Sequence, residues 1–82
     1  MAEPHEVKFS NGKSVQVSAD PNSHSYIDDM AQRIVTEVGT NPLRTMMNAG
    51  FGVAGLILQR RGMKATQKQL DELNRKLQQR LR

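Results

Sequence analysis

The sequence contains no cysteine and few aromatic residues. Its 82 residues therefore cannot form disulfides, thiolate nucleophiles or cysteine-ligated zinc sites. Aromatic residues make up 4% of the chain and hydrophobic residues 37%, so the core must consist mostly of Met, Leu, Ile and Val. A chain of this length forms one small domain, 1–82. Because such a core is thin, the domain would gain stability from self-association.

Acidic residues are scarce in the second half of the chain. Residues 1–39 carry three basic and six acidic residues, whereas residues 40–82 carry nine basic and two acidic residues. The basic half predicts contact with nucleic acid or with an acidic protein partner. The alternative is a solvated basic face that keeps a small oligomer soluble. The expected contact residues are Arg60, Arg61, Lys64, Lys68, Arg75, Lys76 and Arg80.

The sequence also lacks a long hydrophobic run. The stretch MAEPHEVKF has no apolar segment of the signal-peptide type, so we expect a cytoplasmic or intracellular protein. The uncharged stretch 45–59 corresponds to about 22 Å of helix, against roughly 30 Å of hydrocarbon in a bilayer. Arg60 and Arg61 follow it in the manner of a positive-inside anchor. Membrane association through residues 43–59 is therefore a less favoured alternative.

Polar and apolar residues alternate on both sides of an Asn-Gly pair, which predicts a β-hairpin over residues 5–18. A two-residue loop would divide the apolar side chains between the two faces of the hairpin. A three-residue loop, 10–12, pairs Val7 with Val15 and keeps these side chains on one face. It also places Gly12 at the left-handed bulge position. We therefore predict the three-residue loop.

The next segment has apolar residues at helical spacing and predicts an amphipathic helix over residues 21–38. Two starts are open for this helix. Either Asp20 is the N-cap with Pro21 in the first turn, or Ser25 is the N-cap. Gly39 is well placed to end the helix, because glycine readily adopts the left-handed conformation found there.

The stretch GFGVAG, residues 50–55, has the glycine spacing of a dinucleotide-binding loop but not its context. Such a loop follows a buried strand and opens a helix within a βαβ unit. Here the glycines follow a predicted helix start instead. Too few residues come after them to complete a nucleotide-binding domain. We therefore expect no bound cofactor.

Residues 42–61 instead predict a central helix that contains these glycines. Each interior glycine costs a helix about 0.5 to 1 kcal/mol relative to alanine, so a compensating gain is needed. Close packing against another helix is one such gain. The alternative is that the helix bends or breaks near residues 50–52. The small residues expected to form a helix–helix contact are Gly50, Gly52, Ala54 and Gly55.

The C-terminal segment 66–82 predicts a basic helix that opens with a capping box of Thr66 and Gln69. Its leucines recur at helical spacing and form a narrow stripe, as helix pairing requires. We expect this stripe to contact a second helix in a self-associated protein, most simply a homo-oligomer. The stripe consists of Leu70, Leu73, Leu77 and Leu81.

No group of residues predicts catalysis or metal binding. The only histidines are His5 and His24. Asp20, His24 and Asp28 have the spacing of ligands on one helix, but Pro21 moves Asp20 out of helical geometry. The serines have no accompanying base and acid, and no nucleophile elbow is present. We therefore expect a non-enzymatic protein with no catalytic residue and no metal.

Together these features predict an α+β, mainly α fold. An N-terminal β-hairpin is followed by three helices, of which the central one contains glycines and the last carries the leucine stripe. The predicted function is a non-catalytic assembly or adaptor protein that self-associates through helix–helix contacts and presents a basic C-terminal surface. The alternative is a small nucleic-acid-binding protein that uses this surface. Phe51 is the only aromatic residue in the basic half, which disfavours binding by base stacking.

Overall fold

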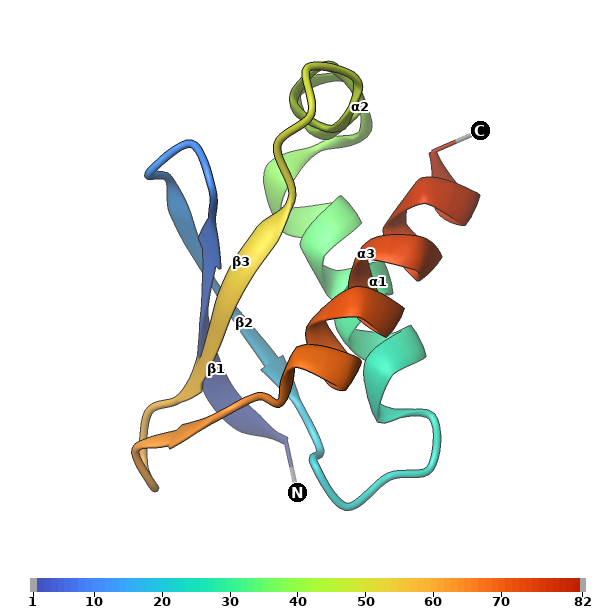
Figure 1. Cartoon of the computed structure of the whole chain (residues 1–82). Coiled ribbons are helices and arrows are strands. Elements are labelled where there is room, and N and C mark those ends of the chain that lie inside the picture. Colours follow the sequence, from blue (N-terminus) through green and yellow to red (C-terminus); the bar gives the residue numbers. More distant parts are fainter. Residues whose placement is uncertain (1, 82) are drawn as a thin grey trace.

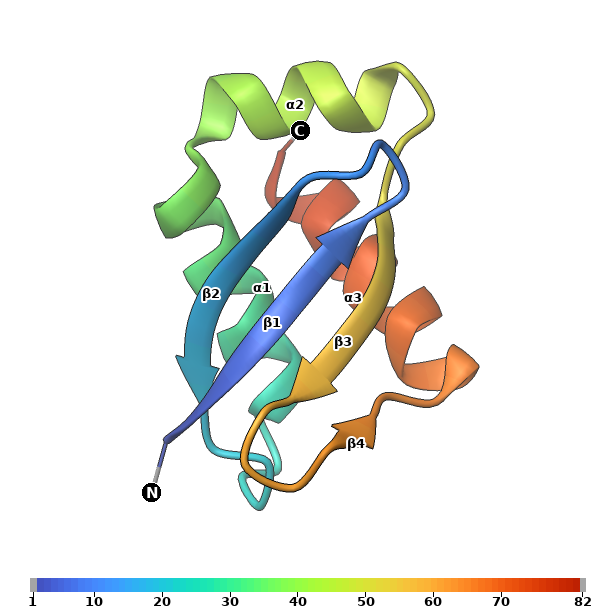
Figure 2. The same ribbon diagram turned by 90° about the vertical axis from the view of Figure 1, so that its left-hand side faces the viewer.

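The computed structural model describes residues 2–81, which form a four-stranded antiparallel sheet and three helices (Figure 1). The strand order is β2-β1-β3-β4. Helices α1 and α3 lie on one face of the sheet, and α2 lies across one end of it (Figure 2). In chain order the elements are β1 (Glu3–Phe9), β2 (Ser14–Ala19), α1 (Tyr26–Val38), α2 (Thr40–Asn48), β3 (Val53–Leu58), β4 (Met63–Lys64) and α3 (Gln67–Arg80).

The N-terminal hairpin forms as predicted, with the three-residue loop. Val7 pairs with Val15. The backbone N–H of Phe9 donates a hydrogen bond of 2.8 Å to the carbonyl of Lys13, which closes the loop. Gly12 has φ of 90°, the left-handed conformation expected at a bulge position. The apolar side chains of both strands therefore share the face that the helices cover.

Helix α1 is shorter than the predicted helix over residues 21–38. It begins at Tyr26 with Ser25 as the N-cap, which is the second of the two predicted starts. Residues 20–25 form turns before it. The helix ends at Val38, and Gly39 follows with φ of 97°, so the predicted C-terminal end is confirmed.

The predicted helix over residues 42–61 is wrong. Its first part forms α2, and its second part forms β3 and the turn after it. Gly50 has φ of 90°, a conformation that ends a helix and is costly for other residues. The apolar run that follows pairs with β1 on one side and with β4 on the other. The four-stranded sheet therefore replaces the mainly α fold with its continuous central helix.

The predicted helix–helix surface on the small residues does not form, because no helix runs through residues 50–55. The four residues of this predicted surface are Gly50, Gly52, Ala54 and Gly55. Gly52 has a different reason to be glycine. A Cβ atom at this position would lie 2.7 Å from Oδ1 of Asn74, too close for two non-bonded atoms.

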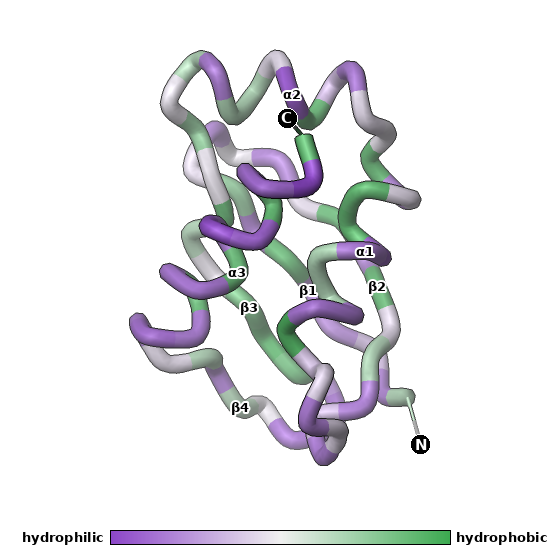
Figure 3. Tube along the Cα trace, turned by 90° about the vertical axis from the view of Figure 1, so that its right-hand side faces the viewer, coloured by the Kyte–Doolittle hydropathy of each residue, from purple (hydrophilic) through white to green (hydrophobic). Residues whose placement is uncertain are grey.

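Helix α3 packs through its leucine stripe onto the chain's own sheet and onto α1. The predicted capping box of Thr66 and Gln69 forms at its N-terminus. Arg82, the last residue of the predicted helix, lies outside the described residues. Strand β3 is mostly hydrophobic, and the outer side of α3 is hydrophilic (Figure 3). All members of the stripe are buried in the core, which removes them as a contact for a second copy: Leu70, Leu73, Leu77 and Leu81.

No helix within residues 2–81 has both the length and the apolar character needed to cross a bilayer. The segment 43–59, considered above as a membrane contact, is divided between α2, a turn and β3.

Candidate functional site

The seven cations expected to contact a partner fall into two groups. One group forms ion pairs with the chain's own acidic residues and consists of Arg61, Lys76 and Arg80. The other group has no ion-pair partner among residues 2–81, and its four side chains are all exposed. We call this group the basic surface: Arg60, Lys64, Lys68 and Arg75.

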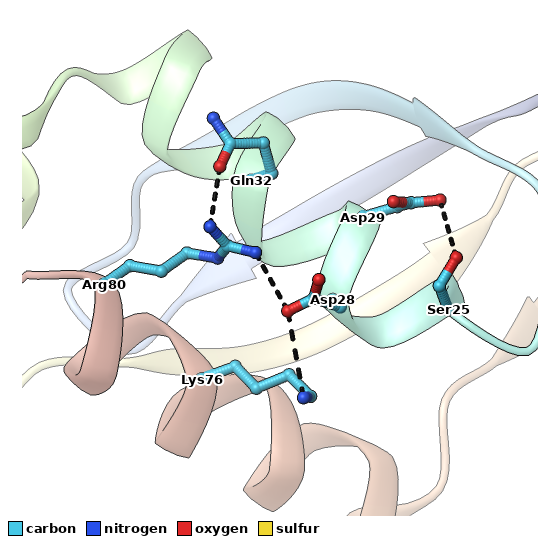
Figure 4. Close-up of polar contacts among 6 residues, drawn as sticks. All are labelled: Ser25, Asp28, Asp29, Gln32, Lys76 and Arg80. Carbon is cyan, nitrogen blue, oxygen red and sulfur yellow. Dashed lines mark hydrogen bonds and ion pairs between the residues drawn. The ribbon is translucent and has the colours of Figure 1, made fainter.

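Lys76 and Arg80 close the contact between α3 and α1 (Figure 4). The Arg80 guanidinium donates hydrogen bonds to Asp28 Oδ1 at 2.9 Å and to Gln32 Oε1 at 2.7 Å. Lys76 Nζ lies 3.8 Å from the same Asp28 oxygen. The Asp28 side chain is 50% exposed, so each pair contributes about 1 kcal/mol or less to stability. Asp28 nevertheless neutralises part of the charge of both cations.

The four cations of the basic surface come from three elements near the β4 edge of the sheet, and Lys64 points to a different side of it from Lys68 and Arg75. Arg60 lies in the turn between β3 and β4. Lys64 pairs with Ile57, so its side chain points to the face of the sheet opposite the helices. Lys68 and Arg75 are seven residues apart and lie on one line of α3, away from the buried leucines. Strand β2 is at the opposite edge of the sheet (Figure 2).

Two acidic residues reduce the charge along α3. Asp71 and Glu72 lie between Lys68 and Arg75 in the sequence, and Asp71 accepts a hydrogen bond of 2.9 Å from the side chain of Gln67. The basic surface together with these two acids has a net charge of +2. Its attraction for anions is therefore moderate and is sensitive to the loss of one cation.

A buried histidine, not assigned from the sequence, lies at the inner face of β1. His5 is fully buried. Its Nδ1 donates a hydrogen bond of 2.8 Å to the carbonyl of Glu3, since a carbonyl oxygen only accepts. Nε2 of the neutral ring therefore accepts the 2.7 Å hydrogen bond from the Tyr26 hydroxyl. Burial lowers the pKa of His5 below 6.5 and outweighs the opposing effects of the Glu3 carbonyl and carboxylate. The same burial raises the pKa of Tyr26, with a smaller contribution from Glu3.

The surroundings of His5 resemble a small polar site, but its geometry suits a structural role. Arg61 lies 3.5 Å from Glu3 Oε1. The other Glu3 oxygen, Oε2, is buried without a hydrogen-bond partner in the described part of the chain. The adjoining cavity has a volume of about 210 Å³, below the range typical of ligand pockets. Both nitrogens of His5 already bond to the protein, so neither is available to a ligand.

The possible metal ligands considered from the sequence are not brought together. His24 precedes α1, whereas Asp28 lies within α1 and bonds to Arg80. Across residues 2–81 no group of three or more His, Cys, Asp or Glu side chains is arranged to hold a metal ion.

Comparisons with known proteins found no relative of this chain. The chain matches no protein-family model, no curated protein and no solved structure. Its contacts, burial and charge distribution are therefore the basis for assigning a function.

Proposed function

We propose that the protein is a small non-catalytic module that binds nucleic acid through the basic surface. The supporting observation is a difference among the predicted cations. Those of the basic surface have no acidic partner in the described chain, whereas the others form ion pairs with Glu3 or Asp28. Exposed lysines and arginines neutralise phosphates and release counterions. Binding of this kind depends on salt and little on nucleotide sequence.

A duplex fits this surface better than a single strand. Proteins that bind single strands combine cations with aromatic side chains on which the bases stack. Phe9 is buried in the core and Tyr26 bonds to His5, so neither is available for stacking. Phe51 is 40% exposed, but it is one ring, whereas successive bases of a single strand stack on several aromatic side chains. The phosphates of a duplex are therefore the ligand that matches the available groups.

The test is a titration of a fluorescent DNA duplex by anisotropy at several salt concentrations. The logarithm of the affinity should fall linearly with the logarithm of the salt concentration. The double variant Lys68→Gln, Arg75→Gln should make the slope of this line shallower by up to about 2. Each lost phosphate contact removes about 0.9 from the slope. A matched control, Lys13→Gln with Arg33→Gln, removes the same charge at sites outside the basic surface.

Two outcomes would overturn the proposal. One is the absence of any anisotropy change at low salt. The other is an equal loss of affinity in the test and control variants, which would show that only net charge matters.

Assembly by self-association is a second candidate function, supported by a different feature. The leucine stripe is occupied within the chain, so it no longer supports this candidate. The outer edge of β2 supports it instead.

A further inference from the structure

Strand β2 forms an edge of the sheet, and the direction of its backbone groups follows from the position of Pro4. The carbonyl of Pro4 accepts a hydrogen bond from the N–H of Gln59, beyond β3, so it points away from β2. Pro4 lies opposite Ser18, and hydrogen-bonded pairs alternate along an antiparallel ladder. The N–H and C=O groups of Ser14, Gln16 and Ser18 therefore point outward, away from β1.

This edge carries none of the features that usually prevent strand addition. Such features include proline, charged residues and β-bulges. Residues 14–19 read SVQVSA and contain neither proline nor charge. Their pairing with β1 is continuous, whereas the pairing of β1 with β3 contains an irregularity. The other edge strand, β4, is only two residues long. Strand β2 is therefore the edge able to accept another strand.

The sequence of β2 selects the strand that fits it. Residues 14–18 read SVQVS, which is the same in both directions about Gln16. An antiparallel copy centred on Gln16 places Ser opposite Ser, Val opposite Val and Gln opposite Gln. The residues with outward backbone groups then face one another, and each such pair exchanges two hydrogen bonds.

We propose that two copies of this chain pair through their β2 strands, antiparallel, with Gln16 opposite Gln16 of the second copy. The contact is isologous, because each copy contributes the same surface and a two-fold axis passes through the Gln16 pair. The two sheets then join into one continuous sheet.

The space beside β2 admits a second strand. A groove of about 560 Å³ lies between β2 and α1 and is lined by Val17 of the strand and by Gln32, Arg33 and Thr36 of the helix. Val15 is only half-buried in the single chain, although it packs against the core. In the proposed register Val17 of the second copy lies opposite Val15 and covers more of its apolar surface.

Charge does not oppose this pairing. Like charges do not meet within the paired segment, because residues 14–19 are uncharged.

The β2 dimer does not depend on the proposed binding of nucleic acid. Because β4 and β2 are at opposite edges of the sheet, the dimer would carry its two basic surfaces at its two ends. Failure of nucleic-acid binding would leave the dimer untouched, and a monomeric protein could still bind a duplex.

The first test is sedimentation velocity of the full chain over a range of concentrations. The wild-type protein should shift from monomer to dimer as its concentration rises. Gln16→Lys should remain monomeric, because it places like charges on the two-fold axis. The matched control Gln79→Lys makes the same change on the exposed side of α3 and should still dimerise. Circular dichroism of each variant checks that the fold is retained.

The second test measures the register directly and uses the absence of cysteine. Cα atoms of a hydrogen-bonded antiparallel pair are about 5.5 Å apart, which suits a disulfide. Gln16→Cys should therefore form a covalent dimer under mild oxidation. Ser14→Cys should not, because its two copies would lie about 13 Å apart along the strands.

The proposal is overturned if the wild-type protein stays monomeric at the highest concentration tested. It is equally overturned if Gln16→Lys still dimerises while folded, or if Ser14→Cys cross-links as readily as Gln16→Cys. Loss of the dimer on addition of a peptide with a β2-like sequence would support the edge of β2 as the contact. Dimerisation insensitive to every change in β2 would assign it to another surface.

Discussion

The side chain of Asn74 in α3 bonds to both backbone polar groups of Val53, at the start of β3. Asn74 Oδ1 accepts a hydrogen bond of 2.8 Å from the Val53 N–H, and its Nδ2 donates one of 3.1 Å to the Val53 carbonyl. The amide thus makes the two hydrogen bonds that a neighbouring strand would make with the first residue of β3. It also fixes the helix against the sheet at the point where the chain changes from α2 to β3.

Asn74→Ala should lower the free energy of unfolding by about 2 to 3 kcal/mol, because it leaves partly buried backbone groups of Val53 without partners. Urea denaturation followed by circular dichroism measures the change. Gln78→Ala, one turn further along α3, removes an exposed amide and should have an effect within about 0.5 kcal/mol. Equal effects of the two substitutions would contradict the role assigned to Asn74.

Gly52→Ala should destabilise the protein through its contact with the same amide. The added Cβ would lie 2.7 Å from Asn74 Oδ1, so the side chain must move and lose its hydrogen bonds. The double variant Gly52→Ala, Asn74→Ala should therefore lose less stability than the sum of the single variants, with a coupling of about 1 kcal/mol or more. Additive effects in the same denaturation experiment would show that the two positions do not interact.

The hairpin, the C-terminal end of α1 and the capping box could be predicted because each depends on residues close together in sequence. A turn residue, a cap and a side-chain period are local features. The segment after Gly50 could not be assigned in this way. Its apolar residues fit one side of a helix as well as a buried strand, and the choice depends on pairing with β1, more than 40 residues away in the chain.

The candidate site shows the same division between local and long-range information. The concentration of basic residues in the second half is visible in the sequence, but their ion pairs are not. Asp28 and Arg80 are 52 residues apart and meet only because α1 packs against α3. The burial of His5 had a weak local signal, since it shares the alternation of Val7 and Phe9 within β1.

The two glycines at positions 50 and 55 should respond in opposite ways to alanine. Gly50 has φ of 90°, so Gly50→Ala should cost about 1 to 2 kcal/mol. Gly55 lies in β3, and a Cβ there would meet the Lys8 Cβ at an ordinary 3.6 Å. Gly55→Ala should raise stability by up to about 1 kcal/mol. Thermal denaturation distinguishes this strand from a continuous helix, in which both substitutions would stabilise.

Stability should fall as the pH is lowered through the range below 6.5, because of His5. Its pKa is lower in the folded protein than in the unfolded chain, so the unfolded chain binds more protons in this range. The contribution is fully present above the unfolded pKa of about 6.5 and is lost as the pH falls through the lowered folded pKa. Urea midpoints between pH 7.5 and 5 should decrease in the wild type. In His5→Leu this part of the pH dependence should disappear, whereas an unchanged profile would assign it to other groups.

Asp28→Asn should strengthen duplex binding while changing stability by less than about 2 kcal/mol, because both of its ion pairs are partly exposed. Removal of this carboxylate releases Lys76 and Arg80, which lie on α3 as Lys68 and Arg75 do. The salt dependence of the affinity should become steeper by up to about 2, since two more cations can reach phosphates. Asp29→Asn is the matched control, because it makes the same charge change next in sequence, where the carboxylate bonds to the Ser25 hydroxyl and to no cation in the described chain. A gain in affinity for Asp28→Asn that exceeds the gain for Asp29→Asn would show that these ion pairs limit the basic surface. Equal gains would mean that net charge alone sets the affinity.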